Sequence, residues 1–483
     1  MTARAGVATL IASFAFPAPA AAHGLVGAED VPIPAWLLTV AAVLVLAVSF
    51  AALALAWPAP RLEADRWRPL PGSRAIVNRA TTVLAGSVGV CLLGLTVWSG
   101  FSGTDQVGFN FSVTFVFVTA WLGLVAVSAV LGDVFRAFNP WRALAVAAGW
   151  GLRRLTGRSI AEPVEYPEWL GRWPAVAGLV AFAWLELSYG VRGLPDEGIE
   201  IPGVTPETVA LATVFYSLYT FVGMAVFGVE VWLRRGETFS VYFSMFAGLA
   251  PLEVRDGVLG RRPWLSGSTR WAGGIPGSAA LVLAAIAVTV FDDARDALFN
   301  RFWIDVWTAL TDVGLSSLDA RRTTNTVFMA LTLAAVTAAY RLGLAGMRRL
   351  ARGPSAAELG RAFAHALIPI ALAYLVAHYF SFFVQQVQAQ FTYLASDPLG
   401  RGWDLFGTAA HRIDFAVLGA TTVWSVQVAA LVTGHAVALA LAHDRALAVY
   451  ASTRDAVRSQ YAMFALMVGF TLLALALISE LTA

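Results

Sequence analysis

The stretch "AFAHALIPIALAYLVAHYFSFFVQQV" (residues 362–387) decides the fold class, because it contains no Asp, Glu, Lys or Arg. A helix of about 20 mostly apolar residues is long enough to cross a membrane. The same stretch carries His378, Gln385 and Gln386, and further glutamines follow at 388 and 390. Polar side chains in or beside a membrane span are costly, so their position calls for an explanation.

Composition extends this conclusion to the whole chain. Its 483 residues are 58% hydrophobic and only 13% charged, and the mean hydropathy is +0.69. Soluble domains are nearer to one quarter charged. We therefore predict an all-α, polytopic transmembrane helix bundle with the lipid bilayer as its surroundings. A formal net charge of +2 gives no reason to expect a nucleic-acid partner.

Two residue types that often carry chemistry are rare or missing. All 33 basic residues are arginine, so a lysine nucleophile or Schiff base is excluded. Cys91 is the single cysteine and lies in an apolar run. A lone cysteine excludes disulfides and cysteine-rich metal sites within the chain.

The beginning of the chain has the pattern of a signal peptide. Arg4 precedes the short apolar run "GVATLIASFAF", and the small residues of "PAPAAAHG" follow. This order is typical of a segment that is cleaved after export. We predict a signal peptide at residues 1–22 and a single integral membrane domain at residues 23–483, with His23 at or next to the mature N-terminus.

Ten later segments are apolar enough to be predicted as spans. They are residues 34–56, 80–99, 111–132, 173–191, 206–233, 275–292, 323–342, 362–387, 415–442 and 459–480. Arginines concentrate in every second loop, namely 57–79, 133–172, 234–274 and 343–361, whereas loop 100–110 has none. Arginine-rich loops favour the cytoplasmic side. The pattern therefore predicts that both mature termini are extracytoplasmic.

Two further segments are predicted as amphipathic helices on the membrane surface. Residues 138–155 begin with Asn139-Pro140, which is a helix start signal, and carry Arg and Trp. Residues 299–315 place aromatic side chains on one side of a helix. Residues 239–252 are apolar but too short to cross the membrane, so we expect a re-entrant, interfacial or core segment there.

Several stretches resemble a bacterial family of polytopic membrane proteins that is commonly labelled fenitrothion hydrolase. They are "LGDVFRAFNPWRALA" (131–145), "AFAWLELSY" (181–189), "RGETFSVYFSMFAGLAPLE" (235–253), "YLASDPLGRGWDLFGTA" (393–409) and "VQVAALVTGHAVALALAHDRAL" (426–447). The resemblance runs from about residue 34 to residue 447. It implies a bacterial cytoplasmic membrane, hydrolysis of organophosphate triesters, and a second, similar membrane subunit. It assigns no catalytic residues.

Span directions predict that polar side chains gather in the outer half of the membrane. We expect Glu186 and His378 to be catalytic, because ionisable groups in spans usually face a polar interior. The side chains expected to line an outward-opening cavity with them are Tyr189, Tyr216, Tyr219, Asp292, Asp293, Gln385, Gln386, Thr421, Thr422 and Ser425. The alternative is structural: His378 would be hydrogen-bonded between helices, and the glutamines would lie at the water interface.

A divalent metal cofactor is a second hypothesis for the outer side. His23, His378 and His411, with Glu186 or an aspartate, would form an imidazole–carboxylate set for zinc or copper. The chain has no HExxH spacing to support it. The other histidines, at 365, 435 and 443, are predicted to lie toward the inner face.

Three functions fit these observations. The first is a membrane-bound hydrolase that acts on phosphotriesters from the extracytoplasmic side, which the family resemblance favours. The second is a transporter or channel that uses the same polar groups, and a polar path toward His435, His365 and His443 would favour it. The third is a non-catalytic membrane subunit of a hetero-oligomer.

The predicted topology can be tested with a reporter fused after Ala483. If both mature termini are extracytoplasmic, alkaline phosphatase fused there is active and a cytoplasm-dependent fluorescent protein is dark. N-terminal sequencing of the mature protein then locates the cleavage site. A C-terminal reporter that works only in the cytoplasm would contradict the prediction.

Overall fold

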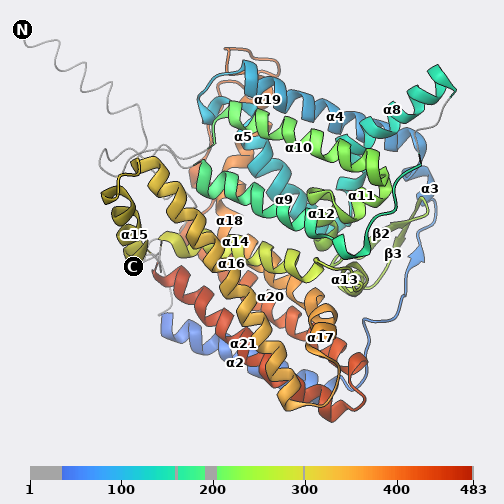
Figure 1. The fold of residues 1–483 in the computed structure, drawn as a ribbon, viewed down its shortest axis with the longest axis vertical. Helices are drawn as coiled ribbons and strands as arrows, with labels where there is room; N and C mark the ends of the chain where they lie inside the picture. The colour runs from blue at the N-terminus through green and yellow to red at the C-terminus, as the bar shows by residue number, and fades with distance from the viewer. Residues whose placement is uncertain (1–34, 158–161, 191–203, 297–299, 481–483) are drawn as a thin grey trace, which may run out of the picture.

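The all-α bundle is confirmed (Figure 1). The computed structural model describes residues 35–157, 162–190, 204–296 and 300–480. Seven described segments are long and apolar enough to cross a membrane: Arg79–Ser102, Phe111–Leu131, Pro206–Phe227, Ser317–Leu350, Ala356–Ser396, Ala420–Val449 and Thr453–Leu475. The predicted signal peptide and His23 lie outside the described residues.

Helices also occupy the other three predicted spans. The main helical elements are α2 (Ala35–Ala56), α4 (Arg79–Ser102), α5 (Phe111–Thr114), η3 (Phe115–Gly123), α6 (Leu124–Leu131), α9 (Trp173–Trp184), η5 (Leu185–Tyr189), α10 (Pro206–Phe227), α14 (Ser278–Asp296), α16 (Ser317–Leu350), α17 (Ala356–Phe363), η7 (Ala364–Leu367), α18 (Ile368–Phe391), α20 (Ala420–Val449) and α21 (Thr453–Glu480). The span predicted at 206–233 ends early, because Gly228 has a φ of 86° and breaks the helix.

Shorter elements connect these helices. They are α3 (Ser73–Ile76), η2 (Val107–Phe109), α7 (Phe135–Phe138), α8 (Pro140–Thr156), η4 (Glu168–Leu170), α11 (Val229–Arg235), α12 (Thr238–Ala247), α13 (Ser266–Ala272), α15 (Asn300–Asp312), α19 (Tyr393–Ser396) and η8 (Phe415–Val417). The surface helices predicted near 138–155 and 299–315 correspond to α8 and α15. Asn139 caps α8 by accepting a hydrogen bond from the backbone N–H of Arg142. The short apolar segment 239–252 holds α12, which is largely buried.

Helix α14 is the centre of the bundle. Every residue from Leu281 to Asp292 is buried, and α9, α16 and α18 pack around the helix. A helix that is apolar all round is normally enclosed on all sides. Because neighbouring helices enclose α14, Asp292 and Asp293 lie deep among other helices.

Close packing of α18 against α20 fixes how the two helices face each other. A Cβ atom on Gly434 would lie 2.3 Å from the Cβ of Ala373 and 2.9 Å from the carbonyl oxygen of Pro369. Only glycine fits at this crossing without displacing the neighbouring helix. Gly434 of α20 therefore lies at the level of Ala373 of α18.

Two of the membrane helices contain π-helical turns. The segment η3 continues α5 within one span, and η5 continues α9 at its end. Such turns are rare and are frequently found at functional sites. Both segments adjoin the candidate site described below.

A small antiparallel sheet lies at the end of the bundle opposite α15 (Figure 1). Its strands are β1 (Arg68–Pro69), β2 (Leu252–Arg255) and β3 (Val258–Arg261), in the order β1-β3-β2. Hydrogen bonds from the Arg255 guanidinium lower the pKa of Asp65 to about 2. Because the pKa is lowered, this exposed pair stabilises the folded state slightly at pH values above the ordinary aspartate pKa. The stabilisation is lost as the pH falls toward 2.

The α18–α20 crossing predicts the effect of enlarging its glycine. Gly434→Leu should lower the stability by about 1–3 kcal/mol or more, because the side chain would overlap Ala373 and a backbone carbonyl. Thermal unfolding in detergent measures the loss. The matched control is Gly469→Ala in α21, where an added Cβ meets nothing within 4 Å. Equal melting temperatures for both variants would contradict the prediction.

Candidate functional site

The candidate site is a buried group of ionisable side chains, which we call the charge cluster: Glu186, Asp292, Asp293, His378 and Tyr379. His378 of α18 lies between the two aspartates at the end of α14. Its Nε2 atom is 2.8 Å from Oδ2 of Asp292, and its Nδ1 atom is hydrogen-bonded to Oδ1 of Asp293. The His378 side chain is 1% exposed, and those of Asp292 and Asp293 are 0% and 12% exposed. The sequence placed these groups in one region, and the structure brings them into contact.

The hydrogen-bond pattern indicates where protons lie in the charge cluster. Ionised carboxylates only accept hydrogen bonds, so each contact with the imidazole needs a proton. Oδ2 of Asp292 also accepts a hydrogen bond from the Tyr379 hydroxyl at 2.8 Å. Two bonds into one oxygen favour an ionised Asp292 and a proton on Nε2 of His378. The contact between Nδ1 of His378 and Oδ1 of Asp293 also needs a proton on one of the two atoms.

Glu186 joins the charge cluster from the π-helical turn η5. It lies close enough to Asp292 and His378 to interact electrostatically with both. Its Oε2 atom is buried and has no hydrogen-bond partner among the described residues. A buried polar atom without a partner costs about 1–3 kcal/mol. A carboxylate kept at this cost is a candidate for binding or for proton transfer.

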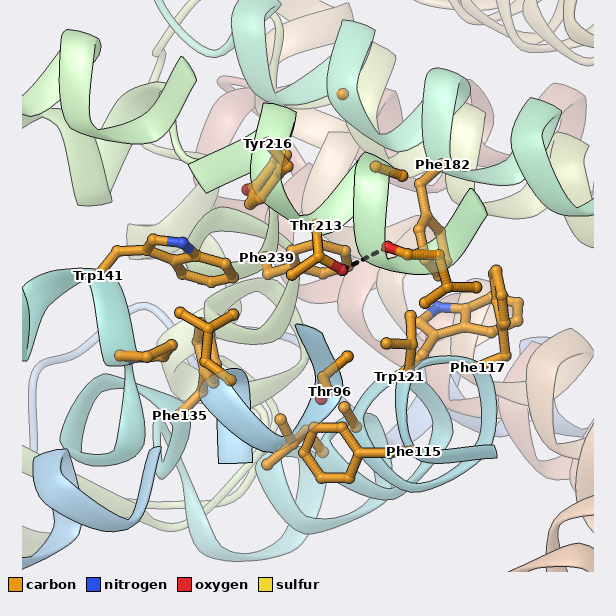
Figure 2. Close-up of a pocket in the computed structure, with 18 of the residues that line it drawn as sticks. Thr96, Phe115, Phe117, Trp121, Phe135, Trp141, Phe182, Thr213, Tyr216 and Phe239 are labelled. Atoms are coloured by element: carbon orange, nitrogen blue, oxygen red, sulfur yellow. Dashed lines mark hydrogen bonds between the residues drawn. The ribbon is translucent and has the colours of Figure 1, made fainter. Parts of the chain in front are cut away.

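A large cavity lies within the bundle, lined by residues of several helices (Figure 2). Its volume is about 680 Å³. Aromatic and aliphatic side chains from α4, η3, α7, α9, α10 and α12 line it, among them Phe115, Phe117, Trp121, Phe182 and Phe239. This lining would accept an apolar molecule with aromatic or branched groups.

The few polar groups in the cavity wall differ in whether they have a hydrogen-bond partner. The hydroxyl of Thr213 donates to the carbonyl of Val209 at 2.7 Å, as the dashed line in Figure 2 marks. The hydroxyl of Thr96 likewise bonds to the carbonyl of Leu92. The hydroxyl oxygen of Thr119, in η3, is buried and has no hydrogen-bond partner among the described residues. Thr119 is therefore a wall residue whose hydroxyl has no partner within the part of the chain that the structure describes.

The cavity and the charge cluster share a wall made by the two π-helical segments. Trp121 of η3 lines the cavity, and its ring lies 5.2 Å from the ring of Tyr379 in an edge-to-face contact. Leu185 of η5 lines the cavity as well, and the next residue, Glu186, belongs to the charge cluster. One layer of side chains thus separates an apolar binding space from acid–base groups.

The cavity reaches the surface of the bundle. Its wall includes Phe215, which is 67% exposed, and Tyr219, which is 39% exposed. Both belong to α10, which is one of the helices long enough to span the membrane. A lipophilic molecule could therefore enter sideways from the bilayer.

Tyr216 and Tyr219 line a cavity, as predicted, but not together with His378. The Tyr216 hydroxyl donates to Glu237, which is fully buried and also accepts from the backbone N–H groups of Phe239 and Ser240. Helix α10, which carries both tyrosines, packs against α4. Span directions do not predict this pairing.

The glutamines hold a loop rather than line the cavity described above. Gln388 donates to the carbonyl of Asp414 and accepts from its backbone N–H, each at 3.1 Å. The Gln385 amide nitrogen donates to the carbonyl oxygen of Phe415 in the same segment, at 3.5 Å. Gln386 is partly buried in the same turn. These contacts fasten the segment before α20 to the end of α18.

The remaining predicted residues do not meet the charge cluster. Thr421, Thr422 and Ser425 are exposed at the start of α20. The ring of Tyr189 contacts the Arg322 guanidinium at 4.1 Å, and its carbonyl accepts from the same side chain. Their positions show that shared depth in the membrane does not establish contact.

The predicted metal site is not assembled in the described part of the chain. No group of three or more His, Cys, Asp or Glu side chains there could hold a metal ion. His411 is exposed in the loop before α20, and both ring nitrogens of His378 are hydrogen-bonded to aspartates. His23, the third proposed ligand, lies outside the described residues.

Trp121, Tyr379 and Thr119 are the site residues that sequence reasoning missed. Tyr379 follows His378 in the chain, and that adjacency was the available signal. Trp121 and Thr119 look like ordinary residues of a membrane span, because the sequence does not predict the π-helical segment that contains them. No protein-family model, curated protein or solved structure matches this chain.

The charge cluster predicts a large stability loss when its central ring is removed. His378→Leu should cost about 3–5 kcal/mol, because it removes the ring that pairs two buried carboxylates. His378→Gln should cost less, since its amide can still donate to one aspartate. Thermal unfolding in detergent compares these variants with His411→Leu in the exposed loop. An unchanged melting temperature for His378→Leu would mean that the imidazole does not hold the aspartates.

Proposed function

We propose that this integral membrane protein binds a lipophilic ester in the aromatic cavity and hydrolyses it with carboxylates of the charge cluster. The observation that carries the proposal is the shared wall, in which Trp121 and Leu185 face the cavity while Tyr379 and Glu186 belong to the charge cluster. Organophosphate triesters with an aromatic leaving group are the substrate class that we infer, following the family resemblance.

The cavity supports a neutral, bulky substrate. Triesters of phosphoric acid carry no charge, so they partition into the bilayer and could reach the exposed side of α10. The aromatic rings around the cavity would pack against an aryl leaving group. The Thr119 hydroxyl, which has no partner among the described residues, could donate a hydrogen bond to the phosphoryl oxygen. Such a donor stabilises the negative charge that develops on this oxygen.

The carboxylates would supply the acid–base chemistry. A water molecule would attack phosphorus while Glu186 or Asp293 takes its proton, and the phosphorus–aryloxy bond would break with its electron pair leaving on the phenolate. The protonated carboxylate then returns the proton to the phenolate, so the products are a phosphodiester and a phenol. His378 has both nitrogens engaged, so we assign it to positioning Asp293 rather than to attack. The substrate would have to displace the Trp121 ring to reach these groups.

Turnover of a dialkyl 4-nitrophenyl phosphate by the protein in nanodiscs tests the proposal, because released nitrophenolate is coloured. Glu186→Gln keeps the shape and removes the charge, so kcat should fall about 10²-fold or more, the contribution of one general acid–base group. Thr119→Val should lower kcat about 10-fold or more by removing the donor to the phosphoryl oxygen. His411→Gln in the exposed loop should leave turnover unchanged.

A variant that fills the cavity tests whether the substrate binds there. Ala212→Trp would fill the space that Ala212 borders, so it should raise KM with little change in melting temperature. The chain is assayed alone and together with a similar membrane subunit, as the resemblance implies. Absence of turnover in both preparations would refute hydrolysis of this substrate class. Turnover that Glu186→Gln and Ala212→Trp leave intact would refute this site.

A further inference from the structure

Polar side chains also line the buried face of α20 below the charge cluster. Gln427, Leu431, His435, Leu439 and His443 recur every four residues and are each at most 1% exposed. Successive residues at this spacing are neighbours on the helix surface, in a row that winds gradually around α20. Histidine is costly in such a place unless it is used, and two of these positions hold it.

His435 has an open proton-accepting atom. Its Nδ1 atom lies 2.8 Å from the carbonyl oxygen of Leu431. A carbonyl only accepts, so Nδ1 carries a proton and the Nε2 atom of the neutral ring keeps its lone pair. Nε2 is buried without a hydrogen-bond partner among the described residues, and the side chain is 0% exposed. A ring held in this tautomer can take up a proton at Nε2 and give it away again.

Tyr374 lies between His435 and the charge cluster, and its hydroxyl donates to the carbonyl of Phe470 at 3.0 Å. It lies one helical turn before His378 on α18, and its ring is 6.1 Å from the His435 ring. Asp293 lies close enough to Tyr374 to interact with it electrostatically. The facing helix α21 carries no titratable side chain over residues 462–475. Tyr374 and His435 are thus the titratable groups that follow the charge cluster along this interface.

His443 is the last residue of this row, near the C-terminal end of α20. Nε2 of His443 lies 3.0 Å from the carbonyl of Trp57, and Nδ1 lies 3.1 Å from Oε1 of Gln460. The Gln460 amide nitrogen donates to the carbonyl of Ala456, which fixes its oxygen toward the ring. Both partners of His443 accept hydrogen bonds, so each contact requires a proton on the ring nitrogen that makes it.

A carboxylate beside His443 leads to the end of the bundle. Asp444 accepts hydrogen bonds from the Trp57 indole and from the backbone N–H groups of Arg61 and Leu62. The next residue, Arg445, pairs with Glu63 at 2.9 Å. This end belongs to the side that the arginine-rich loops predict to be cytoplasmic.

We propose that His378, His435 and His443 are successive stations of a proton path through the membrane. With Gly434 level with Ala373, the helix rise of 1.5 Å per residue puts His435 roughly 9 Å from the level of His378 and His443 roughly 12 Å further on. Together they cover about 21 Å of a hydrocarbon core that is about 30 Å thick.

Each transfer keeps charge and atoms balanced. A proton released from the pair formed by His378 and Asp293 adds to Nε2 of His435, with water as its carrier, and gives an imidazolium. His443 first gives a ring proton to water at the inner end of the path and then accepts the proton that leaves Nε2 of His435, which restores the neutral His435 ring. No electron transfer or further reactant is involved. This proton-conducting activity is separate from ester hydrolysis and needs no substrate in the cavity.

Proton flux into liposomes tests the path. The purified full-length chain is reconstituted with a trapped pH-sensitive dye, and a potassium diffusion potential set by valinomycin drives protons inward. Wild-type protein should acidify the lumen faster than protein-free liposomes. His435→Leu and His435→Gln should each reduce the flux at least about tenfold, because neither side chain takes up a proton at this depth. His411→Gln, off the path, should conduct like wild type.

Two results would overturn the proposal. One is wild-type flux equal to that of protein-free liposomes. The other is unchanged flux in a folded His435 variant, with folding judged by melting temperature. If both His435 variants fail to fold, His443→Gln, which tests the inner station, must lose flux in the same way. The assay contains no ester, so loss of flux and loss of hydrolysis are distinguishable.

Discussion

The pairing of His378 with Asp292 and Asp293 is the constraint on which the rest of the structure depends. Two carboxylates at the end of an apolar helix are costly to bury unless charged or hydrogen-bonded partners reach them. The partner imidazole comes from α18, so α14 and α18 must lie side by side at this depth. The enclosure of α14 by α9, α16 and α18 keeps water away and strengthens each of these interactions.

The π-helical turns η3 and η5 turn this buried pairing into a candidate site. They bring Trp121 and Leu185 to the cavity, and η5 brings Glu186 to the charge cluster. Thr119 and Glu186 each keep a buried oxygen without a partner among the described residues. Unsatisfied oxygens on both sides of one thin wall are expected where a bound molecule completes the hydrogen bonds, and they are costly in a wall that only packs.

Histidines in this bundle are distinguished by their partners rather than by their depth. His378 contacts two carboxylates and His443 contacts two carbonyl-type oxygens, whereas His435 contacts one carbonyl and its Nε2 has no partner among the described residues. Because a neutral imidazole offers one donor and one acceptor, these surroundings define different proton states. An acceptor nitrogen on His435, at a level between His378 and His443, is the arrangement that the proposed relay uses.

The sequence by itself determined the membrane class, the helical fold and the approximate place of the long apolar helices, because long apolar runs have few alternatives in lipid. It also singled out Glu186, His378, Asp292 and Asp293, since ionisable residues in such runs are conspicuous. Only the tertiary structure decided which groups touch. Tyr216 faces the cavity and Gln388 holds a loop, because helix pairing and rotation depend on packing, as at Gly434, and on π-helical turns. Hydropathy records depth along a helix but not the direction in which its side chains point.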